Sequence, residues 1–359
     1  MILPDSVQGL HLHSKRRIIY IYVEEAKYDE GQAFAEQYLA DVTSKHVEPV
    51  APLEPFTSCV HCGDTKCSSL MKHPYRPTPW IGPGSPIVAM HRSSWNRAKL
   101  FTPTMTISKV RKFCKDRNHL CKDEKEKLQY ATWTAGYYDQ TDGQHSLVSV
   151  AHGLEDFKRA QDIVFLTEVA KRDATENGFY PETKIVEVGS SFSQKLDRSK
   201  AIDILKVHIC DAVDRSLFHN KVKATCNSSY HSVEFDLNLP PAPEALGKPV
   251  TKRGIATGET YGTIAELQRF YCRPGASLPL QDCIIVKPGV FAGPGDSGSL
   301  VVSTSNGPGK LQAYGLVLRG MDVIVDDEKI RCVICSKLEA NLVDLRDARK
   351  QQNSREQPS

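Results

Sequence analysis

The sequence of 359 residues has no long apolar run, no strong net charge and no recognisable leader. No run approaches the roughly 18 apolar residues of a membrane span, so we expect no membrane association. The 46 basic and 43 acidic residues give a net charge of +3, which provides no reason to expect a nucleic-acid partner. Residues 1–6 do not resemble a secretory signal, and the apolar run 18–23 is too short for one. We therefore expect a cytoplasmic protein.

The 11 cysteines are odd in number and dispersed, so at least one is unpaired if the others form disulfides. In a reducing cytosol most would be small buried residues. One cluster has spacing compatible with zinc or with a redox pair: Cys59, Cys62, Cys67 and the neighbouring His61 and His73. A second motif, Cys332 to Cys335, stands in an apolar context. We favour structural cysteines, and predict no metal and no cofactor.

Residues 1–129 form the first of three predicted regions and are heterogeneous. Residues 16–23 are rich in β-branched and aromatic side chains and predict a strand, and Asp29 can cap a helix after it. Eight prolines between residues 47 and 88 predict a linker or an irregular segment. Residues 106–129 interleave basic and acidic side chains. This pattern predicts a solvated helix or helical hairpin and argues against a basic nucleic-acid patch.

From about residue 130 the sequence consists of many short candidate strands, which predicts a barrel or a sandwich. The first is 132–138, and Asp142-Gly143 marks a hairpin that returns through 146–150. Further apolar runs of this kind are 163–166, 184–188, 202–209, 233–237, 283–286, 300–303 and 313–317. Leucines at helical spacing predict a closing helix over 338–349, and the polar residues 350–359 predict a disordered tail.

A glycine-rich turn at residues 293–299 contains Ser297 and directly precedes an apolar strand. Ser297 has Gly295 two residues before it and Gly298 directly after it, so its hydroxyl can be exposed with N–H groups close by. A nucleophilic serine needs such donors for the oxyanion that forms when it attacks a carbonyl. A simple hairpin turn is the alternative, because Gly, Asp and Ser all favour turns.

A serine hydroxyl also needs a base beside it, and a carboxylate that fixes the tautomer of that base. His152 directly follows the strand 146–150; the alternative is a histidine that ends a surface strand. Asp203 is flanked by apolar residues inside a predicted strand, where a carboxylate without a partner is costly to bury. An acid at a bulge or strand edge is its alternative, and Asp197 and Asp211 compete with it nearby.

These segments resemble the trypsin/chymotrypsin-like serine proteases, in the non-secreted type of the peptidase domain. Residues 295–299, Gly-Asp-Ser-Gly-Ser, are similar to the nucleophile loop of that family, and Ala151-His152 and Asp203-Ile204 are similar to its histidine and aspartate segments. The order His, Asp, Ser is that of chymotrypsin. The gaps of 51 and 94 residues compare with roughly 45 and 93 there. Residues 250–262 resemble a stretch of the second barrel, and we expect their glycines to serve turns and bulges.

The resemblance covers residues 130–349 and implies a mainly β fold: a chymotrypsin-like double six-stranded β-barrel with a C-terminal helix. A small α/β or irregular N-terminal region precedes it. It implies a serine endopeptidase that cuts a polypeptide substrate through an acyl-enzyme. His152, Asp203 and Ser297 would form the triad, and the backbone N–H groups of Gly295 and Ser297 the oxyanion hole. The alternative is a catalytically silent protease-like interaction module. The N-terminal region could block the cleft or dock a protein partner.

The resemblance also implies four substrate-binding positions. Phe291, six residues before Ser297, matches the base of the primary pocket, and an apolar residue there argues against a preference for Lys or Arg. Leu318, Arg319 and Gly320 match the strand that lines the cleft. Arg319 would favour an acidic group on the substrate, and a solvated arginine is the alternative.

Overall fold

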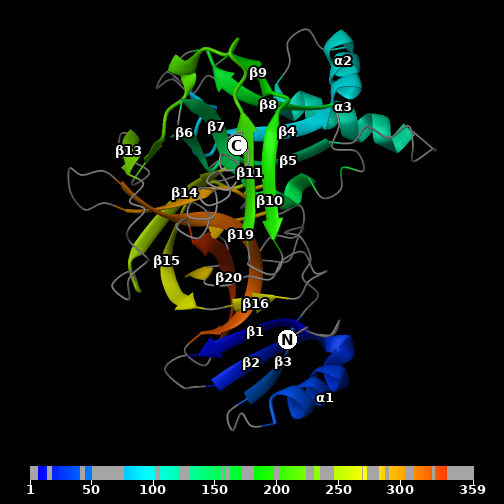
Figure 1. Ribbon diagram of the computed structural model, residues 1–359, viewed down its shortest axis with the longest axis vertical. Helices are drawn as coiled ribbons and strands as arrows, with labels where there is room; N and C mark the ends of the chain where they lie inside the picture. The colour runs from blue at the N-terminus through cyan, green and yellow to red at the C-terminus, as the bar shows by residue number, and fades with distance from the viewer. Residues whose placement is uncertain are drawn as a thin grey trace, which may run out of the picture.

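Sheets dominate the computed structural model, which confirms the expectation of a mainly β protein. Figure 1 shows the sheets arranged along the long axis of the molecule, with the N-terminal sheet at one end and helices α2 and α3 at the other. The residues that the structure describes are 7–13, 18–40, 45–50, 77–101, 106–120, 130–141, 143–154, 157, 162–171, 182–197, 202–223, 230–234, 246–268, 270–272, 283–287, 291–304, 311–325 and 328–337.

A small α/β unit forms the N-terminal end of the molecule (Figure 1). Its sheet has the order β16-β1-β2-β3, with β1 (Val7–His13), β2 (Ile18–Glu24), β3 (Lys45–Val50) and β16 (Phe270–Cys272). The parallel strands β2 and β3 are joined by η1 (Glu25–Lys27) and α1 (Tyr28–Tyr38). Alternation along β2 buries Ile21 and Val23 in one cluster with Phe34 of α1, and Tyr20 and Tyr22 in the main core. The expected strand and helix are therefore confirmed, but Asp29 lies in the first turn of α1 and does not cap it, because Lys27 is the N-cap residue.

Two four-stranded antiparallel sheets follow, with the orders β5-β4-β8-β9 and β10-β11-β7-β6. Their strands are β4 (Pro86–His91), β5 (Tyr130–Thr134), β6 (Tyr137–Thr141), β7 (Gln144–Ser149), β8 (Ile163–Ala170), β9 (Thr183–Gly189), β10 (Phe192–Asp197) and β11 (Ile202–His208). The chain passes between the sheets at the short connections β5–β6 and β9–β10. Hydrogen bonds from Cys210 N to Val188 O (2.8 Å) and from His208 N to Ser191 O (2.9 Å) also join them.

Helices α2 (Arg92–Phe101) and α3 (Ile107–Leu120) lie in the connection between β4 and β5. Their apolar side chains pack against β4 and β8 in a cluster that includes Trp95, Ala98, Ile107, Val110, Cys114, Val88, Met90, Val164 and Leu166. Because the other face of these strands meets the main core, β4 and β8 are buried along almost their whole length without alternation.

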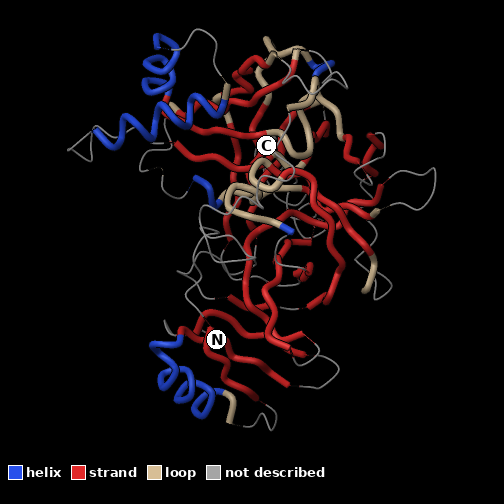
Figure 2. Tube along the Cα trace, turned by 180° about the vertical axis from the view of Figure 1, so that it is seen from behind, coloured by secondary structure: helices blue, strands red, loops and turns tan. Residues whose placement is uncertain are grey.

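The second half of the chain forms a closed six-stranded barrel, in which β19 pairs with both β18 and β20. Its strands are β14 (Pro249–Gly254), β15 (Gly258–Gln268), β17 (Cys283–Lys287), β18 (Leu300–Ser303), β19 (Leu311–Val325) and β20 (Glu328–Lys337). Two short strands, β12 (Lys221–Lys223) and β13 (Tyr230–Glu234), extend the sheet at β19. The red strands of Figure 2 show this barrel below the two four-stranded sheets.

One apolar core joins the two four-stranded sheets to the closed barrel. Leu300, Leu316 and Leu318 of β18 and β19 belong to the same cluster as Leu147 and Leu205 of the first sheets. The alternate residues of β18 and β19, among them Val301 and Val317, belong to a separate cluster within the barrel strands. The shared cluster fixes the position of the barrel against the sheets, so the loops at their seam have defined positions.

Two expectations differ from the structure in this region. The single strand expected at 132–138 is two strands, because Ala135 N bonds Ser85 O and Gly136 N bonds Val148 O, each at 2.8 Å, and the chain changes sheet there. The segment expected to be irregular up to residue 88 ends in β4, which pairs with β5 and β8.

The predicted helix at 338–349, the tail 350–359, the proline-rich residues 51–76 and Asp142 lie outside the described residues. Within the described part of the chain, none of the helices combines the length and the apolar character that a membrane crossing requires.

Candidate active site

A buried carboxylate holds His152 at the end of β7. Val150 and Ala151 continue the strand into the core, and His152 begins the 3-10 turn η4 (His152–Leu154). Asp203, the second residue of β11, has no exposed surface. Its Oδ1 accepts hydrogen bonds from Ala151 N (2.6 Å) and His152 N (2.9 Å), and its Oδ2 lies 2.5 Å from His152 Nδ1.

This arrangement sets the tautomer of the imidazole. An ionised carboxylate only accepts hydrogen bonds, so Nδ1 of His152 carries the proton and Nε2 keeps its lone pair. The side chain of His152 is 23% exposed, which leaves the ring accessible to a reacting group. The competitor Asp211 is instead at the surface, paired with Arg215 at 2.8 Å. Asp197 ends β10.

The loop that carries Ser297 has two unused amide donors. Within residues 293–299 the N–H groups of Gly293, Asp296, Gly298 and Ser299 all donate to groups of the protein. In this described loop the N–H groups of Gly295 and Ser297 have no acceptor. Gly295 and Gly298 adopt φ angles of +97° and +88°, which other residues rarely adopt and which give this loop its shape. Two N–H donors without an acceptor among the described residues thus flank Asp296 in the sequence.

The loops of His152 and Ser297 meet at the end of β5. Thr134 N donates to Ser297 O at 3.0 Å, and Ser149 Oγ, three residues before His152, donates to Thr134 O at 2.6 Å. A side chain on Gly298 would place its Cβ 2.1 Å from Ser149 Oγ, so the two loops are in direct contact there. The Ser297 hydroxyl itself donates to Leu318 O at 3.1 Å. Its proton is directed at a carbonyl of β19 in this arrangement, and not at the imidazole.

Beneath the serine lies a buried ion pair. Asp296, directly before Ser297, and Lys252 of β14 are both fully buried, with Nζ and Oδ2 2.7 Å apart. The carboxylate of Asp296 also accepts from Ala256 N (2.8 Å), Gly293 N (3.0 Å) and Thr257 Oγ1 (2.6 Å). Asp296 thereby joins its own loop to the turn between β14 and β15. Gly254 is required in this place, because a Cβ there would lie 2.1 Å from Asp296 Oδ1.

Lys252 is the residue of this site that the sequence argument did not identify. Burial lowers the pKa of Lys252, and the Asp296 carboxylate opposes that shift. Lys252 also donates to Thr257 Oγ1 and sits next to Cys335, whose thiol pKa is raised by burial. A signal was present in the sequence. Lys252 is two residues after the buried Val250, so the two side chains lie on the same face of β14.

The predicted substrate-binding residues have different environments. The side chain of Phe291 has no exposed surface and packs in the barrel cluster with Val250 and Val301. Leu318 is 2% exposed and presents its carbonyl to the Ser297 hydroxyl. Arg319 is half-buried, and Gly320 is buried. Leu318 is thereby in direct contact with Ser297.

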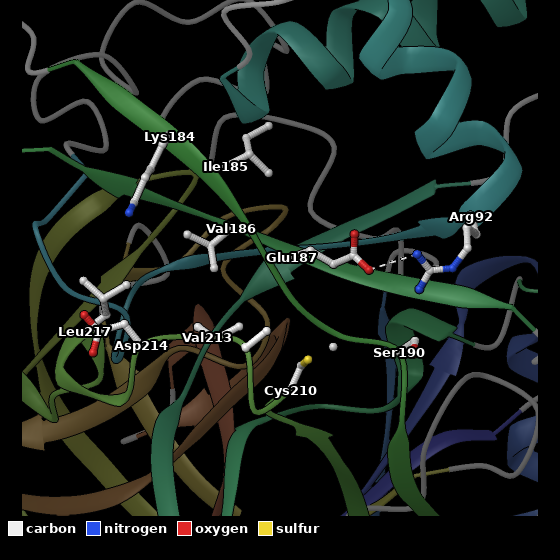
Figure 3. A pocket seen from close by; sticks show the side chains of 12 residues that line it. Arg92, Lys184, Ile185, Val186, Glu187, Ser190, Cys210, Val213, Asp214 and Leu217 are labelled. Atoms are coloured by element: carbon white, nitrogen blue, oxygen red, sulfur yellow. Dashed lines mark ion pairs between the residues drawn. The ribbon is translucent and has the colours of Figure 1, made fainter.

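A cavity of about 570 Å³ lies along β9, away from this site (Figure 3). Its walls are residues 184–190 and the segment that includes Cys210, Val213 and Leu217, with an ion pair of 3.0 Å between Arg92 and Glu187 at one end. None of its lining residues belongs to the group of His152, Asp203 and Ser297. The N-terminal sheet lies beyond the closed barrel from β7 and β11 in both Figure 1 and Figure 2.

Cys59, Cys62 and Cys67, the cluster with zinc-like spacing, lie outside the described residues. Cys332 and Cys335 of β20 are buried. Over the ranges that the structure describes, there is no group of three or more His, Cys, Asp or Glu side chains able to hold a metal ion.

No protein-family model matches the sequence, and no curated protein matches it. Among solved structures, the chain is similar to a Nocardiopsis protease, with 15% identity, 60% of this chain and 90% of that one covered, and a TM-score of 0.37. A glutamic acid specific serine protease has 15% identity, with 60% and 91% covered and a TM-score of 0.39. A Cellulomonas bogoriensis chymotrypsin has 15% identity, with 59% and 87% covered and a TM-score of 0.34. These TM-scores are all below 0.5, so nothing about the chemistry of this chain follows from them.

Proposed function

We propose that the protein is a serine endopeptidase in which Ser297 is the nucleophile, His152 the general base and Asp203 the residue that orients the base. The observation that carries the proposal is the hydrogen bond of 2.5 Å between His152 Nδ1 and the fully buried carboxylate of Asp203. A carboxylate in that position keeps Nε2 available as a proton acceptor and stabilises the imidazolium that forms when the proton is taken.

The fold proposed for this activity is a double barrel of the chymotrypsin type. If β5–β6 and β9–β10 are each counted as one bent strand, strands β4 to β11 make a first barrel of six, and the closed barrel is the second. Backbone hydrogen bonds across the bend at residues 188–191 support this proposal. The site then lies where the two barrels meet.

In the proposed reaction, Ser297 Oγ leaves the Leu318 carbonyl and turns to His152 Nε2, a rearrangement of the kind common between resting and substrate-bound enzymes. Oγ bonds to the scissile carbonyl carbon as Nε2 takes its proton. The negative oxygen of the tetrahedral intermediate is held by the free N–H groups of Gly295 and Ser297.

The intermediate collapses when the carbon–nitrogen bond breaks and His152 gives the proton to the leaving amine. The product of this step is an ester of Ser297. Water, deprotonated by the same imidazole, then attacks the ester and frees the acid product and the serine. All proton transfers use one imidazole, so the orientation imposed by Asp203 matters in both halves of the cycle.

A polypeptide in extended form is the proposed substrate. The segment of β19 next to the nucleophile, Leu318 to Gly320, would contact this polypeptide. Leu318 O already approaches Ser297 Oγ at 3.1 Å. The half-buried Arg319 is the one cation among these positions, so an acidic group on the substrate is the preference to test there.

The test is labelling of the folded, full-length protein with a fluorophosphonate probe, beside hydrolysis of a denatured protein substrate. Wild type should label and cleave, and Ser297→Ala should do neither. Ser299→Ala is the matched control, because Ser299 is in the same loop but fully buried, and it should label like wild type. Equal labelling of wild type and Ser297→Ala would overturn the proposal. A folded wild-type protein that neither labels nor cleaves would favour a catalytically silent interaction module.

A further inference from the structure

Helices α2 and α3 concentrate the positive charge of the protein. Residues 92–129 carry 11 basic and 4 acidic side chains, a net charge of +7, whereas the other 321 residues have a net charge of −4. The described part of this segment is more one-sided, because three of its four acids, Asp123, Glu124 and Glu126, lie outside the described residues. Basic and acidic side chains interleave over 106–129 only when the basic helix α3 is counted together with the segment that follows it.

The exposed cations of the two helices are here called the basic face. It consists of the exposed side chains Arg97, Lys99, Lys109, Arg111, Lys112, Lys115 and Arg117. Asp116 is the one acid among the described residues of either helix. The opposite side of α3 is fixed in the core through Ile107, Val110 and Cys114, so the basic face has a defined orientation. Figure 1 shows both helices at the end of the molecule opposite the N-terminal sheet.

The basic face is not explained by the stability of the fold. Within the described residues, Arg111, Lys112, Lys115 and Arg117 form no ion pair or hydrogen bond through their side chains. Arg111 and Lys115 are four residues apart on one helix, a spacing at which like charges cost a few tenths of a kcal/mol. Lys99, by contrast, approaches Glu187 at 3.8 Å and lies over the ring of Trp95. Four cations of one helix that have no counterion among the described residues point to an anion from outside.

We propose that the basic face binds the phosphate backbone of a nucleic-acid duplex without reading base sequence. A duplex carries about one negative charge per 1.7 Å of its axis. With 14 residues, α3 is about 21 Å long, so several phosphates lie within reach of its cations at once. Lys and Arg contacts to phosphate position a protein on a duplex but carry no sequence information.

Two other kinds of partner, a membrane and an acidic protein, fit the basic face less well. A helix that binds a membrane inserts its apolar face, and the apolar face of α3 is buried against β4 and β8. A stable protein interface has an apolar centre, and Leu100 is the one large apolar side chain exposed on the described residues of α2 and α3. The surface is therefore mainly charged and polar, as a backbone-binding surface is.

The experiment measures fluorescence anisotropy of a labelled DNA duplex of 30 base pairs with the full-length Ser297→Ala protein over a salt series. The test variant is Arg111→Glu/Lys115→Glu. The matched control is Lys171→Glu/Lys248→Glu, which reverses two exposed cations outside the two helices. Circular dichroism checks that all three proteins are folded. Unlabelled vesicles with phosphatidylserine and poly-glutamate are added as competitors at equal concentrations of charge.

The expected result is duplex binding that weakens as salt rises and does not depend on base sequence. Loss of two phosphate contacts should weaken binding about tenfold or more at low salt and make the log–log salt slope shallower by about 2 in the test variant. The control should bind like its parent. Equal binding by the test variant and the control would overturn the proposal. Stronger competition by vesicles or poly-glutamate than by unlabelled duplex would also overturn it, in favour of that partner.

Discussion

Two aspartates of the site, Asp203 and Asp296, are both fully buried, and they are satisfied in different ways. Asp203 accepts hydrogen bonds from two amides and an imidazole, and has no permanent cation at its carboxylate. Asp296 accepts from three amides and a hydroxyl, and in addition faces the ammonium of Lys252 at 2.7 Å. Asp203 lies next to His152, whereas Asp296 directly precedes Ser297 in the nucleophile loop.

A carboxylate without a fixed cation can stabilise a charge that appears only during a reaction. Next to His152, such a carboxylate favours the imidazolium when it forms. A carboxylate that is already neutralised by a buried lysine has little left to offer a reacting group, but it holds a loop firmly. The comparison predicts that substitution of Asp203 lowers activity. Substitution of Asp296 or Lys252 should instead destabilise the nucleophile loop.

The strongest test of this comparison is Asp203→Asn. The amide oxygen can still accept from Ala151 N and His152 N, but its NH₂ group faces Nδ1, so the imidazole must carry its proton on Nε2. We expect kcat to fall about 10⁴-fold with the protein folded. Steady-state kinetics and a urea denaturation curve measure both. Asp211→Asn, a surface control, should change neither, and less than a tenfold loss in Asp203→Asn would contradict the assignment.

The second test is Lys252→Met, which preserves volume and removes the cation. A buried Asp296 left without a counterion should destabilise the protein by about 3–5 kcal/mol, measured by urea denaturation. Adding Asp296→Asn to the same chain should restore part of this loss, because an amide can keep some of the hydrogen bonds. Lys171→Met, which removes an exposed pair with Glu182, is the control with no expected effect. A loss below about 1 kcal/mol in Lys252→Met would show that the pair does not stabilise the loop.

A third buried carboxylate, that of Glu168, extends the comparison to the pH dependence of stability. Glu168 of β8 is 5% exposed and has a hydroxyl and an amide as partners, Thr183 Oγ1 at 2.5 Å and Ile107 N at 3.4 Å, and no cation. Burial raises the pKa of Glu168 above its ordinary 4.5, against the lowering effect of these two hydrogen bonds. The folded state then holds the proton more tightly than the unfolded state.

The unfolding free energy should therefore fall as pH rises from about 4.5 through the raised pKa of Glu168, and should level off above it. Glu168→Gln should remove this contribution. The measurement is the difference between wild type and Glu168→Gln in urea denaturation from pH 4 to pH 7. Two parallel curves would contradict the assignment of this pH dependence to Glu168.

The smallest effect is expected at Ser299. Its hydroxyl is fully buried beside the Asp296 loop and has no hydrogen-bond partner. Ser299→Ala should leave stability unchanged or raise it by up to about 1 kcal/mol, because a desolvated hydroxyl is removed. Denaturation and probe labelling measure this outcome. A loss of stability would mean that the hydroxyl has a partner, for example a bound water.

Some of this structure could be predicted because its cause is local in the sequence. Short β-branched runs identify β7, β8 and β11, since their side chains must be buried. Asp203 could be selected over Asp211 because an acid between apolar residues needs a buried partner, and Asp203 has one in His152. These arguments use only a residue and its immediate neighbours.

What was missed depends on partners that are distant in the chain. Prolines predicted irregular structure, yet Pro86 begins β4 and Pro49 lies in the edge strand β3, the two positions where a strand tolerates proline. The role of Lys252 required knowing that β14 passes under Asp296, 44 residues later. The pairing of β16 with β1 joins residues about 260 positions apart and leaves no trace in either segment.

That pairing has a consequence during synthesis. Strand β1 is made about 260 residues before its outer neighbour, residues 270–272. At about 5–20 residues per second, the outer edge of β1 has no strand beside it for roughly 10–50 s after it leaves the ribosome. An open strand edge invites pairing with other chains. The newborn sheet of β1, β2 and β3 thus depends on residues 270–272, which are made much later, or on a chaperone, for protection from aggregation.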